Sequence, residues 1–173
     1  MLIVTAGLPG AGKSTIAEVV GNRIGAPVVS VDPIESAILR AGIDADEPTG
    51  LAAYLVAETI AEAVLAGGGS VIVDAVNAVE PAREQWLKLA DRQKVAIKFL
   101  EVVCSDPELH RTRLAARGRR LAHIAERSWH AVEQSLDEWE SWSGATGAVP
   151  RITLDSVQAL GVNVERALAF LDV

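Results

Sequence analysis

The sequence has only one cysteine, Cys104, among its 173 residues. A disulfide within the chain is therefore impossible, and a zinc cluster built on cysteine ligands is implausible. Cys104 lies in an apolar, strand-like stretch, so we expect an ordinary packed thiol at this position.

Long apolar runs are missing as well, and so is an excess of positive charge. No apolar run reaches the length of a membrane span, and the N-terminal apolar stretch continues into a glycine-rich loop without a basic segment or a cleavage site. We therefore expect a cytoplasmic protein that does not enter a membrane. The formal net charge of −7 argues against a protein built to hold long nucleic acid.

The remaining composition is that of an ordinary globular protein. Hydrophobic residues make up 50% of the chain and charged residues 23%. No internal repeat, low-complexity tract or long linker divides the chain. We therefore expect residues 1–173 to form one domain with one core.

Residues 7–14 read GLPGAGKS and match the phosphate-binding pattern GxxxxGK[ST]. An apolar run precedes them and an amphipathic segment follows, so the context is strand, glycine loop, helix. The glycines allow successive N–H groups to turn toward a phosphate, and Lys13 would reach the β- and γ-phosphates of a nucleotide. The Ser14 hydroxyl would hold Mg²⁺. The predicted nucleotide-binding residues are Gly7, Leu8, Pro9, Gly10, Ala11, Gly12, Lys13, Ser14, Thr15 and, from a later segment, Arg113.

Five apolar segments alternate with segments of helical pattern, which predicts an α/β fold with a five-stranded parallel sheet and helices on both faces. The expected strands are 2–6, 27–31, 70–74, 96–103 and 151–154. The expected helices are 15–24, 33–41, 51–65, 81–92, 105–116, 122–142 and 163–171. In the third of these helices the apolar side is expected to consist of Leu51, Tyr54, Leu55, Ala61, Val64 and Leu65. Residues 67–69, three glycines, are interpreted as its stop.

Two aspartates come at the ends of expected strands, where ligands bind in sheets of this kind. Asp74 has the form of a Walker-B acid that holds Mg²⁺ or one of its waters; the alternative is a helix or turn cap. Asp32 is a candidate base for a substrate hydroxyl, but Asp32-Pro33 also has the form of a helix N-cap followed by proline. The same dipeptide at Asp106-Pro107 is interpreted as a cap.

Six of the twelve arginines fall between residues 111 and 127. Arg113, Arg117 and Arg120 are spaced for one helical face. Guanidinium groups can neutralise the charge of a transferring phosphoryl group, so we predict that this segment is a lid over the nucleotide, with Arg117 and Arg120 in catalytic roles. Solvated surface arginines are the alternative.

Together these features resemble the small P-loop kinases, in particular the group with polynucleotide 5′-hydroxyl kinase domains, chloramphenicol phosphotransferase and zeta toxins. The likeness rests on residues 7–14, on Asp32, on residues 71–74 with Asn77 and Arg83, and on the arginines of residues 111–120. It implies a P-loop NTPase fold of the nucleoside and nucleotide kinase type, with ATP and Mg²⁺ as cofactors. By this resemblance Lys13 and Ser14 hold ATP and Mg²⁺, Asp32 is the general base, and some of Arg111, Arg113, Arg117 and Arg120 contact phosphates.

One position departs from that group. Its polynucleotide kinases typically carry an arginine three residues after the catalytic aspartate, where this chain has Glu35. We therefore favour a kinase for a hydroxyl on a neutral or cationic small molecule, such as an antibiotic, a nucleoside or a sugar. A polynucleotide 5′-hydroxyl kinase and a nucleotide-hydrolysing switch are the alternatives, although the NKxD motif of common GTPases is absent. Arg83 is interpreted either as a contact for a substrate anion or as a surface residue. The tryptophans at 129, 139 and 142 are expected to pack.

Overall fold

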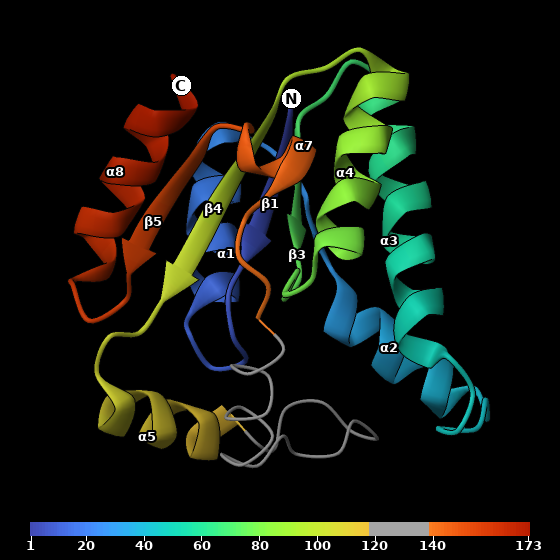
Figure 1. Cartoon of the computed structure of the whole chain (residues 1–173), viewed down its shortest axis with the longest axis horizontal. Coiled ribbons are helices and arrows are strands. Elements are labelled where there is room, and N and C mark those ends of the chain that lie inside the picture. The colour runs from blue at the N-terminus through green and yellow to red at the C-terminus, as the bar shows by residue number, and fades with distance from the viewer. Residues whose placement is uncertain (118–138) are drawn as a thin grey trace.

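A computed structural model of the chain describes residues 1–117 and 139–173 (Figure 1). The strands are β1 (Leu2–Ala6), β2 (Val28–Ser30), β3 (Val71–Asp74), β4 (Ile97–Val103) and β5 (Arg151–Asp155). The helices are α1 (Lys13–Ile24), α2 (Val31–Arg40), α3 (Thr49–Ala66), α4 (Glu80–Gln93), α5 (Pro107–Arg117), α7 (Gly144–Gly147) and α8 (Leu160–Leu171).

The five strands form one sheet in the order β2-β3-β1-β4-β5, and every pairing is parallel. The prediction of a five-stranded parallel sheet is therefore confirmed. The central strand β1 pairs with β3 on one side and β4 on the other, and all five of its residues are buried. An apolar strand without polar alternation is what a sheet covered on both faces requires.

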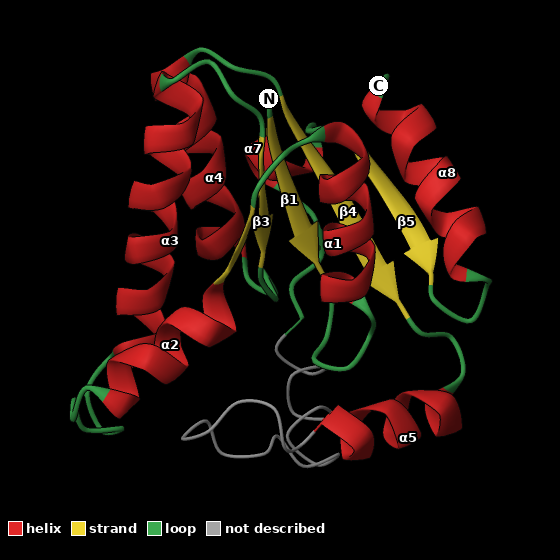
Figure 2. Ribbon diagram, turned by 180° about the vertical axis from the view of Figure 1, so that it is seen from behind, coloured by secondary structure: helices red, strands yellow, loops and turns green. Residues whose placement is uncertain are grey.

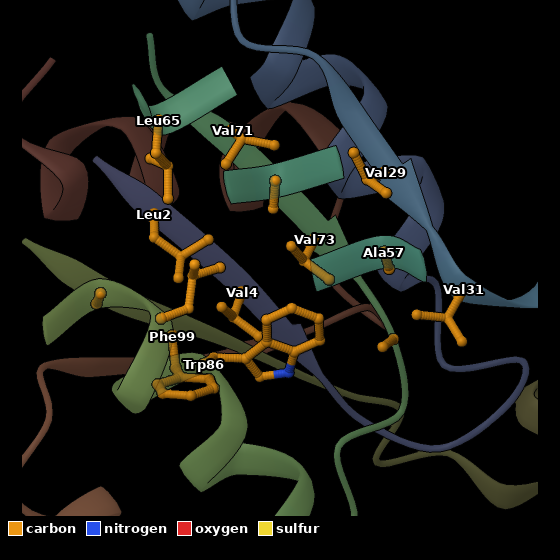
Figure 3. Packing of buried hydrophobic residues seen from close by; sticks show 14 of the residues in the cluster. Leu2, Val4, Val29, Val31, Ala57, Leu65, Val71, Val73, Trp86 and Phe99 are labelled. Carbon is orange, nitrogen blue, oxygen red and sulfur yellow. The ribbon is translucent and has the colours of Figure 1, made fainter. Parts of the chain in front are cut away.

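Successive strand residues point to opposite faces of the sheet and so supply two separate core clusters. Leu2 and Val4 of β1 belong to the cluster drawn in Figure 3, which also contains Trp86 of α4. Ile3, between them, belongs to the cluster that includes Ile16 of α1. Helices α3 and α4 thus cover one face of the sheet, and α1 and α8 cover the other, as Figures 1 and 2 show.

Helix α3 packs on the sheet through a side that matches the expected one only in part. Ala61 and Leu65 are buried as expected, and Tyr54 and Val64 pack against the same core cluster. Leu51 and Leu55 were expected on its apolar, buried side, yet they are 60% and 52% exposed. The buried residues recur at every fourth position and are mostly alanines, which let the helix backbone approach the sheet closely: Thr49, Ala53, Ala57, Ala61 and Leu65. An apolar pattern alone did not distinguish this small-residue side from the side with larger residues.

Among the described helices α3 alone is long and apolar enough to cross a membrane by length and composition. The expectation that no segment reaches such a length was therefore wrong by this criterion. Glu58 and Glu62 interrupt the apolar run, and both pair with Arg92 of α4. In this fold α3 is a layer of the domain that packs on the sheet.

The remaining boundaries differ from the expected ones by a few residues, and the glycine stop after α3 is confirmed, with Gly67 as its C-cap. The helix expected at 122–142 lies mostly outside the described residues. Its last part, Trp139–Trp142, is not helical. Trp142 packs edge-on against Phe99 with ring centroids 4.9 Å apart, so the expected packing role is confirmed for this tryptophan.

Candidate active site

The glycine loop joins β1 to α1 at the carboxyl edge of the sheet, and its glycines adopt conformations that other residues avoid. Gly7, Gly10 and Gly12 have φ angles of 144°, 82° and 100°. Gly12 is the N-cap of α1, no side chain caps that helix, and its first turn holds no acidic residue. The first N–H groups of α1 are therefore available for an external anion, to which the helix dipole also contributes.

Gly7 lies close against the neighbouring strand β4. A Cβ atom at this position would lie 2.1 Å from the carbonyl oxygen of Val102 in β4. We expect Gly7→Ala to lower the free energy of unfolding by about 2–3 kcal/mol, because the methyl group forces the two strands apart at a strained φ. Urea denaturation followed by circular dichroism measures this loss. Gly161→Ala in α8 is the matched control, because no atom lies within 4 Å of the added Cβ and alanine favours the helix. Equal stability of the two variants contradicts the prediction.

A cavity of about 600 Å³ opens above the loop and the start of α1. Of the predicted nucleotide-binding residues, Gly10, Gly12, Lys13, Ser14, Thr15 and Arg113 line it. Gly7, Leu8, Pro9 and Ala11 do not line it, so their predicted contact with a nucleotide stays a prediction. Asp32, in the first turn of α2, and Asp74, at the end of β3, line the same cavity. One space thus joins the glycine loop and Lys13 to both aspartates, and Glu18 of α1 lines it as well.

Lys13 lies at the bottom of this cavity and is only 6% exposed. Its Nζ atom donates a hydrogen bond to the carbonyl oxygen of Leu8 at 3.1 Å, which bends the side chain back over the loop. The ammonium group is therefore held over the phosphate cradle by backbone of the same loop. The glycine-loop motif alone therefore accounts for the position of Lys13.

Asp74 is fixed by hydroxyl groups from two neighbouring strands. The Oγ1 atom of Thr5 in β1 lies 3.2 Å from Oδ1, and the Oγ of Ser30 in β2 lies 3.1 Å from Oδ2. Asp74 is 6% exposed, so these donors compensate for its burial. Mg²⁺ sites in nucleotide-binding proteins use few protein oxygens and several waters. The Ser14 hydroxyl and the Asp74 carboxylate, in one cavity, fit such an ion.

Asp32 lies within α2 and not at its cap. The helix begins at Val31, its N-cap is Ser30, and Asp32 is the acidic residue of the first turn. The cap interpretation of Asp32-Pro33 is therefore wrong, because the helix starts before the dipeptide. The positive end of the helix dipole favours the ionised carboxylate at this place. At Asp106-Pro107, in contrast, Asp106 Oδ1 accepts hydrogen bonds from the N–H groups of Glu108 and Leu109, and the expected cap is confirmed.

The far end of the cavity is built by α5 and by the turn between β5 and α8. Arg113 donates hydrogen bonds from Nη1 to Ser156 Oγ at 2.7 Å and from Nη2 to the Ser156 carbonyl at 3.0 Å. Ser105 donates hydrogen bonds from its N–H and its hydroxyl to the Asp155 carboxylate, and these bonds lower the pKa of that carboxyl. The same bonds hold the start of this turn in place. Sequence reasoning missed this wall, whose further members are Gln158, Leu160 and Asn163. The end of a fifth parallel strand was the one available signal.

The predicted lid is described only in part. Arg111 is exposed and pairs with Glu108 at 3.0 Å on the same helix, and it does not line the cavity. Arg117 ends α5, and its side chain, like the whole of Arg120 and the rest of residues 118–127, lies outside what the structure describes. The catalytic roles of Arg117 and Arg120 stay predictions.

Cys104 is half-buried and follows the end of β4, so it is not the packed strand thiol that was expected. Its Sγ atom lies 3.4 Å from the Asp106 carbonyl and 3.9 Å from Arg113 Nη1. Both contacts are to residues of the turn and helix beside the cavity.

Arg83 is fully buried, so both sequence-based interpretations of it were wrong. Its guanidinium donates to the carbonyl oxygens of Asn77, Ala78 and Glu140 at 2.7–2.9 Å and lies 4.1 Å from the ring centre of Trp142. Burial lowers the pKa of this guanidinium, and Glu80, 3.7 Å from Nη1, opposes the effect. Arg83 thus ties the loop after Asp74 to residues 139–142. Asn77, with φ 50°, is held in the same network by Trp86 and Thr5.

The family model described as AAA domain matches residues 2–141. No curated protein matched the chain in sequence. A proposed kinase from Chloroflexus aurantiacus j-10-fl superposes with a TM-score of 0.78 at 19% identity, over 98% of this chain and 97% of that one. A sugar kinase from Janibacter sp. HTCC2649 gives 0.71 at 22%, over 99% and 94%.

Kti12 of Chaetomium thermophilum, solved in complex with ADP-AlF3, gives a TM-score of 0.77 at 17% identity, over 99% of this chain and 97% of that one. At these identities the similarity establishes the fold. The predicted α/β fold of P-loop NTPases, and the resemblance to a small P-loop kinase domain, are therefore confirmed.

Proposed function

Because this chain belongs to the AAA domain family whose model matches residues 2–141, and has the fold of P-loop kinases, we propose that it is an ATP-dependent kinase acting on a small-molecule hydroxyl. One observation carries the proposal. A single cavity brings the cationic glycine loop, Lys13 and Ser14 together with the carboxylates of Asp32 and Asp74. A transferring phosphoryl group needs both a cradle of positive charge and a carboxylate near the attacking oxygen.

In this mechanism the N–H groups of the loop and of the first turn of α1 bind the β- and γ-phosphates of ATP. Lys13 turns from the Leu8 carbonyl toward these phosphates and offsets the charge of the transition state. The acceptor hydroxyl attacks the γ-phosphorus, the bond from that phosphorus to the β,γ-bridging oxygen breaks, and ADP leaves. Asp32 accepts the hydroxyl proton. Arg113 and the Ser156 turn border the end of the cavity where we expect the base to lie.

Mg²⁺, held by Ser14 and through Asp74, would neutralise phosphate charge and fix the phosphates in line with the acceptor. Asp74 keeps its orientation because Thr5 and Ser30 donate to its two oxygens. We place the enzyme in the cytoplasm, a compartment whose reducing conditions suit the free thiol of Cys104.

The acceptor side of the cavity favours neutral or cationic molecules. The elements on this side are α2, which carries Asp32 and packs against α3, and β3, which ends at Asp74. The residues on this side that line the cavity are Ser30, Asp32, Pro33 and Asp74, so two are carboxylates and none is lysine or arginine. A phosphorylated or carboxylated acceptor would therefore meet like charge on this side, at an energetic cost. This balance supports an uncharged or amine-bearing hydroxyl compound over a polynucleotide end.

The test is transfer of labelled γ-phosphate from ATP, with Mg²⁺, into a panel of acceptors. The panel contains nucleosides, aminoglycosides, a 5′-hydroxyl oligonucleotide and three matched sugars: glucosamine, glucose and gluconate. We expect label in a neutral or cationic acceptor, with transfer to gluconate and the oligonucleotide the weakest. Asp32→Asn is expected to reduce the rate about a hundredfold or more, because the amide cannot accept the hydroxyl proton.

Glu47→Gln, in the exposed turn before α3, is the matched control and is expected to keep the wild-type rate. Label in the oligonucleotide alone would support a polynucleotide kinase instead. Label released only as free phosphate, at an equal rate in Asp32→Asn, would support a nucleotide-hydrolysing switch and rule out Asp32 as the base.

A further inference from the structure

His110 of α5 contacts the tip of the glycine loop from outside the cavity. Its Nε2 atom lies 2.7 Å from the carbonyl oxygen of Pro9, and the residue is only 5% exposed. Because a carbonyl oxygen can only accept, Nε2 carries the proton and donates it. The ring also packs on Gly10, where a Cβ atom would lie 3.2 Å from the imidazole. Figures 1 and 2 both show α5 at this end of the sheet, near the loop between β1 and α1.

The contacted carbonyl belongs to the central peptide of a β-turn. The N–H of Ala11 donates to the carbonyl of Leu8 at 3.1 Å, which closes a turn over residues 8–11. Proline at the second position and a glycine with φ 82° at the third identify it as type II. Types I and II share proline at the second position and differ by reversal of the central peptide. The sequence Pro9-Gly10 therefore permits either orientation.

In a trans peptide the C=O and N–H bonds point in opposite directions. When the Pro9 carbonyl is directed at His110, the Gly10 N–H is directed away from His110. Gly10 lines the cavity, whereas His110 does not. Among the described residues the Gly10 N–H has no acceptor. The donor is thus available to an anion in the cavity. A reversed peptide would present an oxygen there and repel a phosphate.

We infer that His110 is a positioning residue for the phosphate site: by holding the Pro9–Gly10 peptide in the type II turn, it directs the Gly10 N–H toward a bound phosphate. This inference rests on the proposed nucleotide-binding function. It assigns to α5 a second task besides carrying Arg113, since one helix then fixes both the loop tip and the far wall of the cavity.

The test measures binding of Mg·ADP and of tripolyphosphate to the full chain by isothermal titration calorimetry. Tripolyphosphate probes the phosphate cradle without the base. His110→Leu fills the space of the ring with an apolar side chain that cannot donate. We expect it to weaken both affinities about tenfold, because the Gly10 N–H is then no longer held toward the phosphate, and one hydrogen bond to a charged group is worth about that much. His110→Gln retains an N–H donor and is expected to recover most of the loss. In His110→Ala, added imidazole is expected to restore binding in part.

Leu89→Ala is the stability control, because Leu89 is fully buried on the opposite face of the sheet. We expect it to unfold more easily but to bind both ligands as the wild type does. If His110→Leu binds as the wild type does, or if His110→Gln and His110→Leu bind equally weakly, the inference is wrong while the proposed function stands. If the wild type binds neither ligand, both are wrong. If His110→Leu does not fold, rescue of His110→Ala by imidazole decides the matter.

Discussion

Lys13→Ala is expected to lower kcat/KM for ATP by at least about a thousandfold, whatever the acceptor proves to be. The reason is that a fixed cation acting on a transferring phosphoryl group stabilises charge that grows in the transition state. Lys13 is 6% exposed and lies over the loop, so water can replace its charge only poorly. Removing the side chain also leaves the N–H groups of the loop as the main remaining donors to the phosphates.

The measurement is the same labelled transfer assay, run with the best acceptor found in the panel and with ATP varied. Lys88→Ala is the matched control, because Lys88 is an exposed lysine of α4 that pairs with Glu84 on its own helix. We expect the control to keep wild-type kinetics. Wild-type turnover in Lys13→Ala would contradict the P-loop mechanism as a whole, and a change in KM alone would limit Lys13 to binding.

Most of the fold could be predicted because a covered parallel sheet has a strong sequence signal. Each apolar run, such as residues 2–6 and 71–74, ends in a polar or glycine-rich turn and is followed by a helical pattern. The side of α3 that packs on the sheet could not be predicted in the same way. Hydrophobicity favours Leu51 and Leu55, whereas close approach of the backbone favours the alanines, and only the tertiary packing decides between them.

The position of the glycine loop, of Lys13 and of Ser14 at the cavity was predictable from the sequence, and the other walls were not. The motif of residues 7–14 carries its own geometry, since the glycines, Lys13 and Ser14 act within one local turn. His110 and Ser156, in contrast, reach the loop and Arg113 across 101 and 43 residues of sequence. Such contacts depend on how α5 and the β5–α8 turn pack, and no local pattern marks them.

The burial of Arg83 could not be predicted from the sequence either. An arginine in the middle of an amphipathic helix normally points to solvent, because burying a guanidinium costs several kcal/mol unless its donors are satisfied. Here three backbone carbonyls accept hydrogen bonds from Nε and Nη2, and two of those carbonyls come from the loop that follows Asp74. Nη1 has no hydrogen-bond partner among the described residues, but it lies 3.7 Å from the Glu80 carboxylate, and the guanidinium packs on the face of Trp142. The partners lie in segments whose approach the sequence does not reveal, so neither a surface role nor a substrate contact was the right interpretation.

Arg83→Met is expected to lower the free energy of unfolding by about 3–5 kcal/mol, the range measured when one partner of a buried charged network is removed. Methionine fills much of the space, yet the carbonyls of Asn77, Ala78 and Glu140 lose their donor. For a domain of this length such a loss corresponds to a fall of about 10 °C in Tm. Urea denaturation and a thermal melt measure both quantities.

Arg92→Met, on the same helix, separates burial from charge. Arg92 is exposed and pairs with Glu58 and Glu62 at the surface, so its loss is expected to destabilise the fold far less than the loss of Arg83. Equal destabilisation by the two variants would show that the buried network contributes no more than a surface pair. If Arg83→Met were as stable as the wild type but had a raised KM for the acceptor, Arg83 would be a substrate contact after all. Because the Arg83 side chain is fully buried and donates to three backbone carbonyls, we expect Arg83→Met to lose stability and Arg92→Met to lose far less.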